Sequence, residues 1–403
     1  MTKPGANTPF VAIACGGTGG HLFPGLAVAE QLTQRGCAVA LLISPKDVDQ
    51  QAVTSARGME IVTLPAVALQ NRNYLSFARS FWQSWRASRK IFKSHPPHAV
   101  LAMGGFTSAP PILAAKKFGA KTFLHESNTI PGRANRFLAR FVDEIFAGFH
   151  EAVTRFRGVP PSRIKVIGTP VRPQFSPHAR RQTPDASCRA TLGLDPNCPT
   201  VLVVGGSQGA SGVNEMILSA LPLLAGRGWQ WLHLTGTNDF EKVKAAYGAV
   251  GFKAVVKPFL AEMDLALGAA TAAVSRAGAS SLAELAAMRV PSLLVPFPAA
   301  AGNHQFFNAR AFEATGAARL LEQKDATPEK VAAMLRELVE NETARRAMQT
   351  ALAQWHAPRA AEQIAENILS AITRSAANKD FSLAPRSGQK AGVKGEMNLK
   401  VVA

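Results

Sequence analysis

The sequence has few of the features that mark membrane-spanning, disulfide-stabilised or zinc-binding proteins. Its 403 residues include only four cysteines, Cys15, Cys37, Cys188 and Cys198, and none of them forms a C-x-x-C pair. This scatter argues against a disulfide framework and a zinc site, and favours reduced thiols in a cytosolic protein. No apolar run approaches the ~18 residues of a membrane-spanning helix. We also expect no signal peptide, because the first residues lack its charged and apolar regions.

The common nucleotide-binding formulas are missing as well. No G-x-x-x-x-G-K-[S/T] sequence is present, which excludes a P-loop, and the glycine clusters do not follow G-x-G-x-x-G. Ser44 stands where a dinucleotide-binding fold usually has its ribose-binding acid. Asp47 and Asp49 form a D-x-D pair, which a solvated turn explains better than a metal site does. The histidines form no metal-ligand motif, so the sequence predicts neither a metal nor another cofactor.

Positive charge is concentrated in the first part of the chain. The net charge is +18; residues 1–170 contain 20 Lys and Arg against 8 Asp and Glu, whereas residues 199–373 contain 15 of each. A basic first half beside a neutral second half indicates an anionic partner for the first half. Nucleic acid would be such a partner, but no DNA- or RNA-binding motif accompanies the charge, so none is predicted.

Short apolar runs alternate with helical runs in two successive blocks. The predicted strands begin at Phe10, Ala38, Ala99 and Lys121 in the first block, and at Thr200, Trp229, Lys253, Ala272 and Pro291 in the second. This alternation predicts an α/β fold of two doubly wound, Rossmann-like domains. We expect a first domain at 1–170, a proline-rich linker at 171–198, and a second domain at 199–373 that closes with helices at 327–352 and 359–373. A disordered basic tail is expected at 374–403.

Three glycine-rich loops follow predicted strands and precede predicted helices. They are CGGTGGH at 15–21, AMGGFTS at 102–108 and VVGGSQGA at 203–210. Glycine lets a backbone approach a ligand closely, and a helix N-terminus presents free N–H groups to an anion. One such loop is weak support, but three together indicate contacts with phosphate. Because ligands bind at the carboxyl ends of strands in such sheets, the two domains should face a cleft lined by these loops.

Polar side chains that can take part in catalysis or binding lie beside these loops. His21 follows the first glycine cluster, where it can act as a general base or cap and pack the helix. His125, Glu126 and Asn128 end a predicted strand, where they can bind sugar hydroxyls or form a capping turn. Further along, SRAGASSLAELAAM at 275–288 places serines at a helix start.

Glu284 lies one helical turn beyond Ser280, on the same face. Phosphate bound by the serines and backbone, with a ribose diol on Glu284, is one interpretation of this segment. A capping box from Ser281 to Glu284 is the other, and both can hold at once.

The stretch NRNYLSFARSFWQSWRASRKIFKS at 71–94 has aromatic residues at helical spacing and basic residues on another face. Such a helix can lie in a membrane interface, where each basic residue contributes on the order of 1 kcal/mol near anionic lipid. A packed helix with a solvated basic face is the alternative. The charge of the first half favours the membrane, with a predicted membrane face of Arg79, Phe81, Trp82, Trp85 and Arg86.

Seven segments between about Phe10 and Thr373 resemble one family: GGTGGHLFPGLAVAEQL, MGGFTSAP, LHESNTIPGRANRFLA, GTPVR, VVGGSQGA, SRAGASSLAELA and PFPAAAGNHQFFNA. It is the MurG family of peripheral membrane N-acetylglucosaminyltransferases, which have the GT-B fold. The resemblance implies transfer of GlcNAc, with inversion, from UDP-GlcNAc to the C4 hydroxyl of MurNAc in undecaprenyl-pyrophosphoryl-MurNAc-pentapeptide (lipid I), which forms lipid II. It also implies a place on the cytoplasmic face of the inner membrane, other cell-wall synthesis proteins as partners, and no cofactor.

The resemblance further implies roles for individual residues. His21 would be the catalytic base, and Gly17, Gly104 and Gly105 would hold the acceptor pyrophosphate. The implied UDP-GlcNAc-binding residues are Thr18, Gly19, Gly20, Asn128, Arg172, Ser207, Leu260, Ala279, Ser280, Ser281, Leu282, Ala283, Glu284 and Gln305. The family often has HEQN where this chain has HESN, with Ser127, and the segment 374–403 has no recognised counterpart.

Other functions fit the same loops. A UDP-GlcNAc 2-epimerase or a lipid glucosyltransferase would share the fold, although an epimerase has no use for the basic aromatic helix. A non-catalytic scaffold at the membrane would bind UDP-GlcNAc and form no product.

Overall fold

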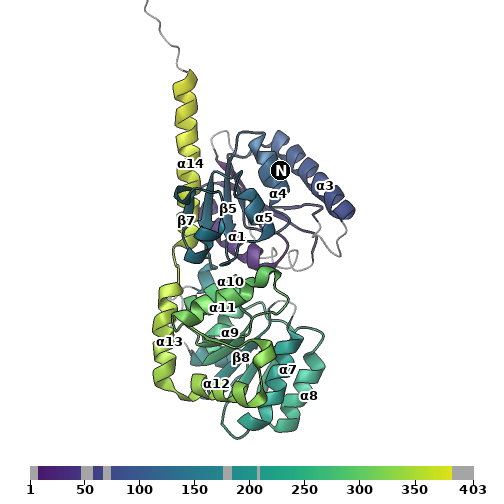
Figure 1. Cartoon of the computed structure of the whole chain (residues 1–403), viewed down its shortest axis with the longest axis vertical. Helices are drawn as coiled ribbons and strands as arrows, with labels where there is room; N and C mark the ends of the chain where they lie inside the picture. The colour runs from purple at the N-terminus through teal and green to yellow at the C-terminus, as the bar shows by residue number, and fades with distance from the viewer. Residues whose placement is uncertain (1–7, 47–57, 67–73, 176–183, 207–208, 384–403) are drawn as a thin grey trace, which may run out of the picture.

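A computed structural model describes residues 8–46, 58–66, 74–175, 184–206 and 209–383 (Figure 1). Two parallel β-sheets form the centres of two α/β domains, which lie one above the other in Figure 1. This arrangement confirms the predicted fold class. None of the helices within the described ranges is both long and apolar enough to cross a membrane.

The first domain has seven parallel strands. In spatial order they are β3 (Glu60–Thr63), β2 (Ala38–Ile43), β1 (Phe10–Ala14), β4 (Ala99–Ala102), β5 (Lys121–Glu126), β6 (Glu144–Ala147) and β7 (Ile164–Val166). The central strands β1 and β4 are buried along their whole length and β5 is buried after Lys121, as expected when helices cover both faces of a parallel sheet. The covering helices include α1 (Gly19–Gln34), α3 (Tyr74–Ser94), α4 (Ala109–Lys116) and α5 (Arg133–Leu138).

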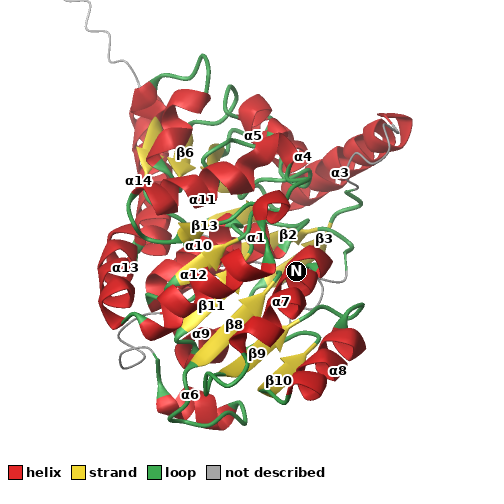
Figure 2. Cartoon of the chain, turned by 60° about the horizontal axis from the view of Figure 1, so that its bottom comes forward, coloured by secondary structure: helices red, strands yellow, loops and turns green. Residues whose placement is uncertain are grey.

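The second domain repeats this plan with six parallel strands. Their order is β10 (Lys253–Lys257), β9 (Gln230–Leu234), β8 (Thr200–Val204), β11 (Ala272–Ser275), β12 (Ser292–Leu294) and β13 (Arg319–Leu320). Figure 2 shows this sheet between its helices. The helices are α7 (Ser211–Ala220), α8 (Phe240–Val250), α9 (Met263–Ala269), α10 (Ala279–Met288), α11 (His304–Ala314), α12 (Pro328–Glu340) and α13 (Glu342–Trp355).

Both sheets reverse their strand order at one point. The reversal lies between β1 and β4 in the first sheet and between β8 and β11 in the second. Ligand crevices of doubly wound folds lie at such points, outside the carboxyl ends of the strands. The glycine loops after β1, β4 and β8 and the segment 276–278 after β11 therefore all lie where a ligand is expected.

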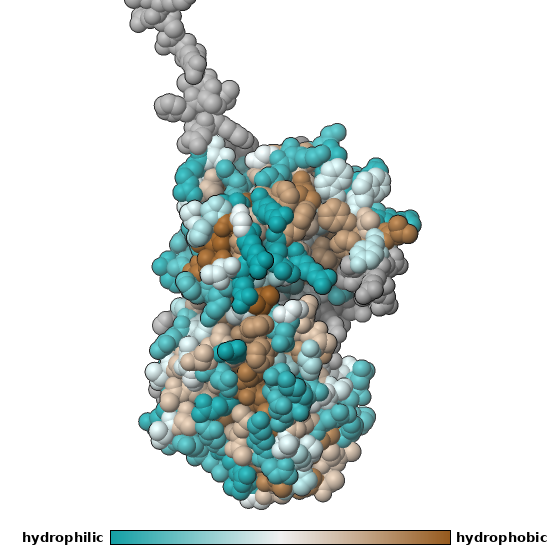
Figure 3. Space-filling model, viewed as in Figure 1, coloured by the Kyte–Doolittle hydropathy of each residue, from teal (hydrophilic) through white to brown (hydrophobic). Residues whose placement is uncertain are grey.

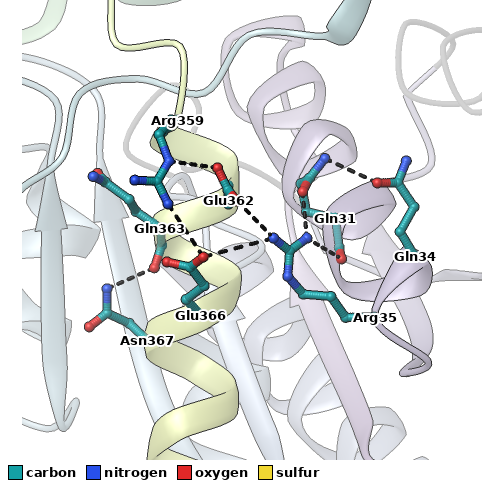
Figure 4. A network of polar contacts seen from close by, with 8 residues as sticks. All are labelled: Gln31, Gln34, Arg35, Arg359, Glu362, Gln363, Glu366 and Asn367. Atoms are coloured by element: carbon teal, nitrogen blue, oxygen red, sulfur yellow. Dashed lines mark hydrogen bonds and ion pairs between the residues drawn. The ribbon is translucent and has the colours of Figure 1, made fainter.

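The last helix, α14 (Ala360–Leu383), packs against the first domain. Its Ile364, Ala365 and Ile368 are buried in the same apolar cluster as residues of α1. Arg35 at the end of α1 forms ion pairs with Glu362 at 3.2 Å and Glu366 at 3.9 Å, and Figure 4 shows these pairs. The chain thus crosses between the domains a second time.

The predicted domain and helix boundaries differ from the structure in three places. The segment 359–373, assigned to the second domain, packs on the first, and its helix continues to Leu383 instead of ending at 373. The linker's second half forms α6 (Ala186–Thr191), and Cys188, in this helix, belongs to the second domain's core. The predicted helix 327–352 is two helices that meet at Asn341, whose side chain accepts a hydrogen bond from the Ala344 amide and caps α13.

Candidate functional site

Two helix N-termini meet across the domain junction. The Ser280 hydroxyl, in the first turn of α10, donates a hydrogen bond of 3.0 Å to the Gly20 carbonyl in the first turn of α1. Each helix N-terminus carries a partial positive charge, equivalent to roughly half an elementary charge. Two helix N-termini that face each other create a region of positive electrostatic potential, which attracts anions. The predicted phosphate contacts in α1 and in α10 thus lie together at the junction.

His21 lies in the first turn of α1, against the glycine loop that follows β4. A Cβ atom on Gly104 would lie 3.0 Å from His21 Nε2, and one on Gly105 would lie 3.1 Å from its Nδ1. Both glycines also have positive φ values, of 108° and 78°. These contacts place the imidazole flat against the Gly104–Gly105 backbone, a position that a larger side chain at either site would close.

Thr18 sets the orientation of the imidazole ring. Thr18 is the N-cap residue of α1, but its hydroxyl lies 3.1 Å from His21 Nδ1 instead of capping the helix. When Nδ1 carries the proton and donates to this hydroxyl, the lone pair is on Nε2. In this tautomer His21, at the domain junction, has the geometry of a general base.

The loops around His21 are fixed by side chains that the sequence analysis did not single out. The Thr107 hydroxyl donates to the Gly16 carbonyl at 2.7 Å, and the Ser108 hydroxyl donates to the Gly104 carbonyl at 2.6 Å. Lys46 donates to the Gly17 carbonyl at 3.1 Å. Lys46 thereby brings a positive charge to the loop predicted to hold the acceptor pyrophosphate. Its place just after the carboxyl end of β2, the strand next to β1, was the signal that could have revealed it.

The predicted sugar contacts of His125 and Glu126 are wrong, because both side chains are buried and already paired. The Glu126 carboxylate accepts hydrogen bonds from the Asn128 and Gly132 amides, both at 2.9 Å, and from the Asn135 side chain at 2.8 Å. Burial raises the pKa of Glu126, although these hydrogen bonds lower it in part. His125 lies between Gly168 O at 3.0 Å and Ser127 Oγ at 3.2 Å. These two residues build the loop that carries Asn128.

Burial makes His125 sensitive to acid, and this leads to a first prediction. Burial lowers the pKa of His125 to about 4 and that of His233, in the second domain, to about 3. Unfolded histidine titrates near 6.5, so between these values the unfolded chain binds more protons than the folded one. The free energy of unfolding should therefore fall as the pH drops below about 6.5, by up to roughly 1.4 kcal/mol per pH unit for each histidine.

Urea unfolding at pH 7 and pH 5 measures this slope. His125→Asn should reduce the difference between the two pH values, even if it lowers stability at both. His150→Asn, at an exposed position of the first domain, is the matched control and should leave the slope unchanged. An unaltered slope in His125→Asn would contradict the assignment.

Arg172 and Glu284 face each other beside the junction. Arg172 Nη2 lies 3.9 Å from Glu284 Oε1, and each side chain is 14% exposed. The guanidinium stacks over Phe23 of α1 at 4.2 Å, so the arginine touches both domains. Within the described part of the chain, the buried Arg172 Nε has no hydrogen-bond partner. Burial raises the pKa of Glu284 to about 7, although the nearby Arg172 lowers it and Asp264 raises it further.

Asn308 joins the two domains and was missed by the sequence analysis. It is fully buried in α11, where its Oδ1 accepts 2.9 Å hydrogen bonds from both the amide and the hydroxyl of Thr129. Its amide group donates to Asn128 Oδ1 at 3.0 Å. Asn128 is therefore held at the junction between the two domains. Gln305, one turn earlier in α11, accepts from the Phe297 amide at 2.9 Å.

The remaining residues predicted to bind UDP-GlcNAc have different surroundings. The N-cap of α10 is Gly278, without a side-chain cap, so the alternative capping box of Ser281 and Glu284 is not formed. Gly19 begins α1, and the other residues of the predicted set lie in the first two turns of α10: Ala279, Ser281, Leu282 and Ala283. Leu260 is buried after β10. Ser207, and the Asp47 and Asp49 pair, lie outside the described residues.

Helix α3 buries three serines and one aromatic residue, and leaves part of its predicted membrane face exposed. Its buried positions are Ser80, Ser84, Ser88 and Phe92, and this helix packs on α4. Phe81 and Trp85 lie at the edge of this contact, against the core of the first domain. Trp82 is 52% exposed and Leu75 is 87% exposed. Arg79 and Arg86 are exposed too, and the Arg86 guanidinium stacks over Trp82 at 4.6 Å.

Comparison with protein families gives two matches. Residues 11–147 match the glycosyltransferase family 28 N-terminal domain, and residues 200–364 match the glycosyltransferase family 28 C-terminal domain. These segments contain the second sheet, the first sheet except β7, and most of the junction described above.

Individual relatives match nearly the whole chain. A protein of Anaeromyxobacter dehalogenans (strain 2CP-C), named UDP-N-acetylglucosamine–N-acetylmuramyl-(pentapeptide) pyrophosphoryl-undecaprenol N-acetylglucosamine transferase, is 36% identical over 94% of this chain and 97% of its own length. A protein of the same name from Citrifermentans bemidjiense is 37% identical over 82% of this chain and 90% of its own.

Solved structures agree with this result. MurG of Acinetobacter baumannii superposes with a TM-score of 0.70 at 26% identity, over 90% of this chain and 99% of that one. The UDP-GlcNAc 2-epimerase of Neisseria meningitidis, bound to UDP-GlcNAc, superposes with a TM-score of 0.66 over 90% of this chain and all of that one. At 12% identity the second likeness shows the fold alone.

Proposed function

Because this chain belongs to glycosyltransferase family 28, we propose that it transfers N-acetylglucosamine from UDP-GlcNAc to N-acetylmuramyl-(pentapeptide) pyrophosphoryl-undecaprenol, the activity for which its relatives are named. The observation that carries the proposal is the meeting of two helix N-termini at Gly20 and Ser280, with His21 directly beside it. Transfer from a nucleoside diphosphate sugar needs this pair of features: positive potential for the phosphates, and a base near the acceptor hydroxyl that attacks the anomeric carbon.

The donor half of the site lies in the second domain. The diphosphate would lie beside the α10 N-terminus, with Ser280, Ser281 and the N–H groups around Ala279 as donors. Arg172 would neutralise the negative charge that develops as UDP leaves, since its Nε has no other partner. Glu284 would accept hydrogen bonds from the ribose hydroxyls. Asn128 and Gln305 are the proposed contacts to the sugar, and Leu260 would contact the uracil through its backbone.

The acceptor half lies in the first domain. Gly17, Gly104 and Gly105 form the proposed cradle for the acceptor pyrophosphate, and Lys46 adds a cation to it. His21 Nε2 would take the proton from the attacking C4 hydroxyl. Thr18 would hold the ring in the required tautomer.

UDP release is the direct test of the transfer reaction. Purified protein should release UDP from UDP-GlcNAc in detergent only when a lipid I analogue is present, and also in the presence of EDTA. Release without the acceptor would indicate hydrolysis or epimerisation. Binding of UDP-GlcNAc without release under any condition would indicate a non-catalytic scaffold. Either result would contradict the proposed transfer.

We further propose that α3 holds the protein on the cytoplasmic face of an anionic membrane, where its lipid-linked acceptor lies. Trp82 and Leu75 are exposed apolar side chains, and Arg79, Arg86 and Arg89 are exposed on the same helix. This combination of exposed aromatic and basic side chains is typical of interfacial helices. Any association with other cell-wall enzymes stays a prediction.

Trp82→Ala tests the membrane contact without disturbing the core. Trp82 is half exposed, whereas Trp85 packs against the first domain, so only Trp82 can be removed at little cost in stability. We expect Trp82→Ala to weaken binding to phosphatidylglycerol vesicles about ten-fold, which corresponds to about 1.4 kcal/mol.

Vesicle sedimentation at low and high salt measures this effect. Phe259→Ala is the matched control, because Phe259 is 55% exposed in the second domain. Equal binding of wild type and Trp82→Ala would place the membrane face elsewhere.

A further inference from the structure

A second polar groove lies in the first domain, on the far side of α5 from His21. It is a cavity of about 680 Å³ between α5 and the turn of 3-10 helix η2 (His150–Arg155). Four arginines line it, Arg136, Arg140, Arg155 and Arg157, together with the apolar side chains of Ile130 and Phe137. The face of this domain seen in Figure 3 carries hydrophilic and hydrophobic side chains side by side above the domain junction.

The four arginines have no compensating charge. Among the described residues, none of the four forms an ion pair or a side-chain hydrogen bond, and only Arg155 has another contact, 6.0 Å above the Phe307 ring. All four side chains are exposed. A guanidinium presents a planar fork that matches a carboxylate or a phosphate. The groove is therefore suited to a ligand with several acidic groups and some apolar surface.

The groove lies beside the junction between the two domains. On the opposite face of α5, the Asn135 amide lies 3.2 Å from where a Cβ on Gly104 would be, and Gly104 contacts His21. On the side of the second domain, a Cβ on Gly302 would lie 3.8 Å from Ile130 Cγ2. A substituent that leaves the reaction centre between the two domains would therefore meet this groove.

We propose that the groove binds the peptide of the acceptor through its terminal carboxylate, an inference that rests on the proposed function. An N-acetylmuramyl group carries its peptide through a lactyl ether on C3, which is the neighbour of the reacting C4. Five extended residues span about 17 Å, enough to pass around a helix of about 10 Å diameter. The peptide ends in a carboxylate, which Arg140 and Arg157 would bind, and Phe137 would contact its apolar side chains.

The test compares acceptors with and without the peptide. In the double variant Arg140→Gln/Arg157→Gln, the KM for a pentapeptide-bearing lipid I analogue should rise ten- to a hundred-fold, as expected for loss of charged hydrogen bonds. The KM values for a peptide-free acceptor and for UDP-GlcNAc should stay at the wild-type level. Arg133→Gln is the matched control, because Arg133 is exposed on the same helix but does not line the groove.

Three outcomes would overturn the inference, and each differs from a failure of the transfer itself. One is equal KM values for both acceptors in the wild type. Another is a rise of the KM for both acceptors in the double variant together with weaker vesicle binding, which would indicate that the groove binds anionic lipid. The third is a rise of the same size in the KM of Arg133→Gln for the pentapeptide-bearing acceptor. If wild-type protein transferred the sugar to neither acceptor, the proposed function would fail instead.

Discussion

His21→Ala should lower kcat by about 10²–10⁴-fold, the usual contribution of a positioned general base. The Kd for UDP-GlcNAc should change little, because the imidazole lies against the Gly104–Gly105 loop of the first domain, whereas the proposed donor site lies at α10 of the second. Stopped or steady-state assays of UDP release give kcat, and calorimetric titration with UDP-GlcNAc gives the donor Kd. If kcat falls while the donor Kd stays unchanged, His21 acts in the chemical step and does not merely support the fold.

Thr18→Val sharpens this test. It removes the hydroxyl at 3.1 Å from Nδ1 while keeping the shape of the side chain. Without that partner the ring can adopt either tautomer, so kcat should fall by less than in His21→Ala and its pH profile should shift. His150→Ala, at an exposed site of the same domain, is the control. If His21→Ala lost kcat and donor affinity to the same extent, or lost its thermal transition, the histidine would be structural.

The glycine loops and His21 could be predicted from the sequence because their signals are local. An apolar strand, a glycine cluster and a helix start follow each other within about 20 residues, and the doubly wound fold fixes which strand ends carry ligands. The same argument placed Ser280 and Glu284 at the start of one helix. That Ser280 contacts Gly20, 260 positions earlier, follows only from how the two domains dock.

Contacts between distant segments explain most of what the sequence did not reveal. The sequence suggests that His125 and Glu126 are exposed polar residues at a strand end. The loop after them instead folds back and surrounds the carboxylate with four hydrogen-bond donors from three residues. In α3, which packs on α4, the fully buried positions include three serines, and the sequence pattern of aromatic residues did not reveal these. Nothing near residue 364 indicates that α14 packs against α1, because its partner residues lie in the first 50 positions.

Glu284 should make donor binding depend on pH near neutrality. A carboxylate can accept from both ribose hydroxyls, whereas a protonated carboxyl group loses the charge and half of this capacity. Since burial raises the pKa of Glu284 to about 7, the group is largely protonated below that pH when the site is empty. The Kd for UDP-GlcNAc should therefore increase as the pH falls from 8 to 6. Binding at pH 6.5 should release a proton, because the ribose hydroxyls favour the charged form.

Calorimetric titrations in buffers of different ionisation enthalpy measure both the affinity and the proton release. Glu284→Gln keeps the size of the side chain but removes the titration, so its donor affinity should be weaker by roughly ten- to a hundred-fold at pH 8 and nearly independent of pH. Glu262→Gln, at an exposed position of the same domain, should retain the wild-type pH profile. A pH dependence that persisted in Glu284→Gln would identify another titrating group. If donor affinity were unchanged at pH 8, Glu284 would not contact the ribose, and its pairing with Arg172 would serve only to hold the domains together.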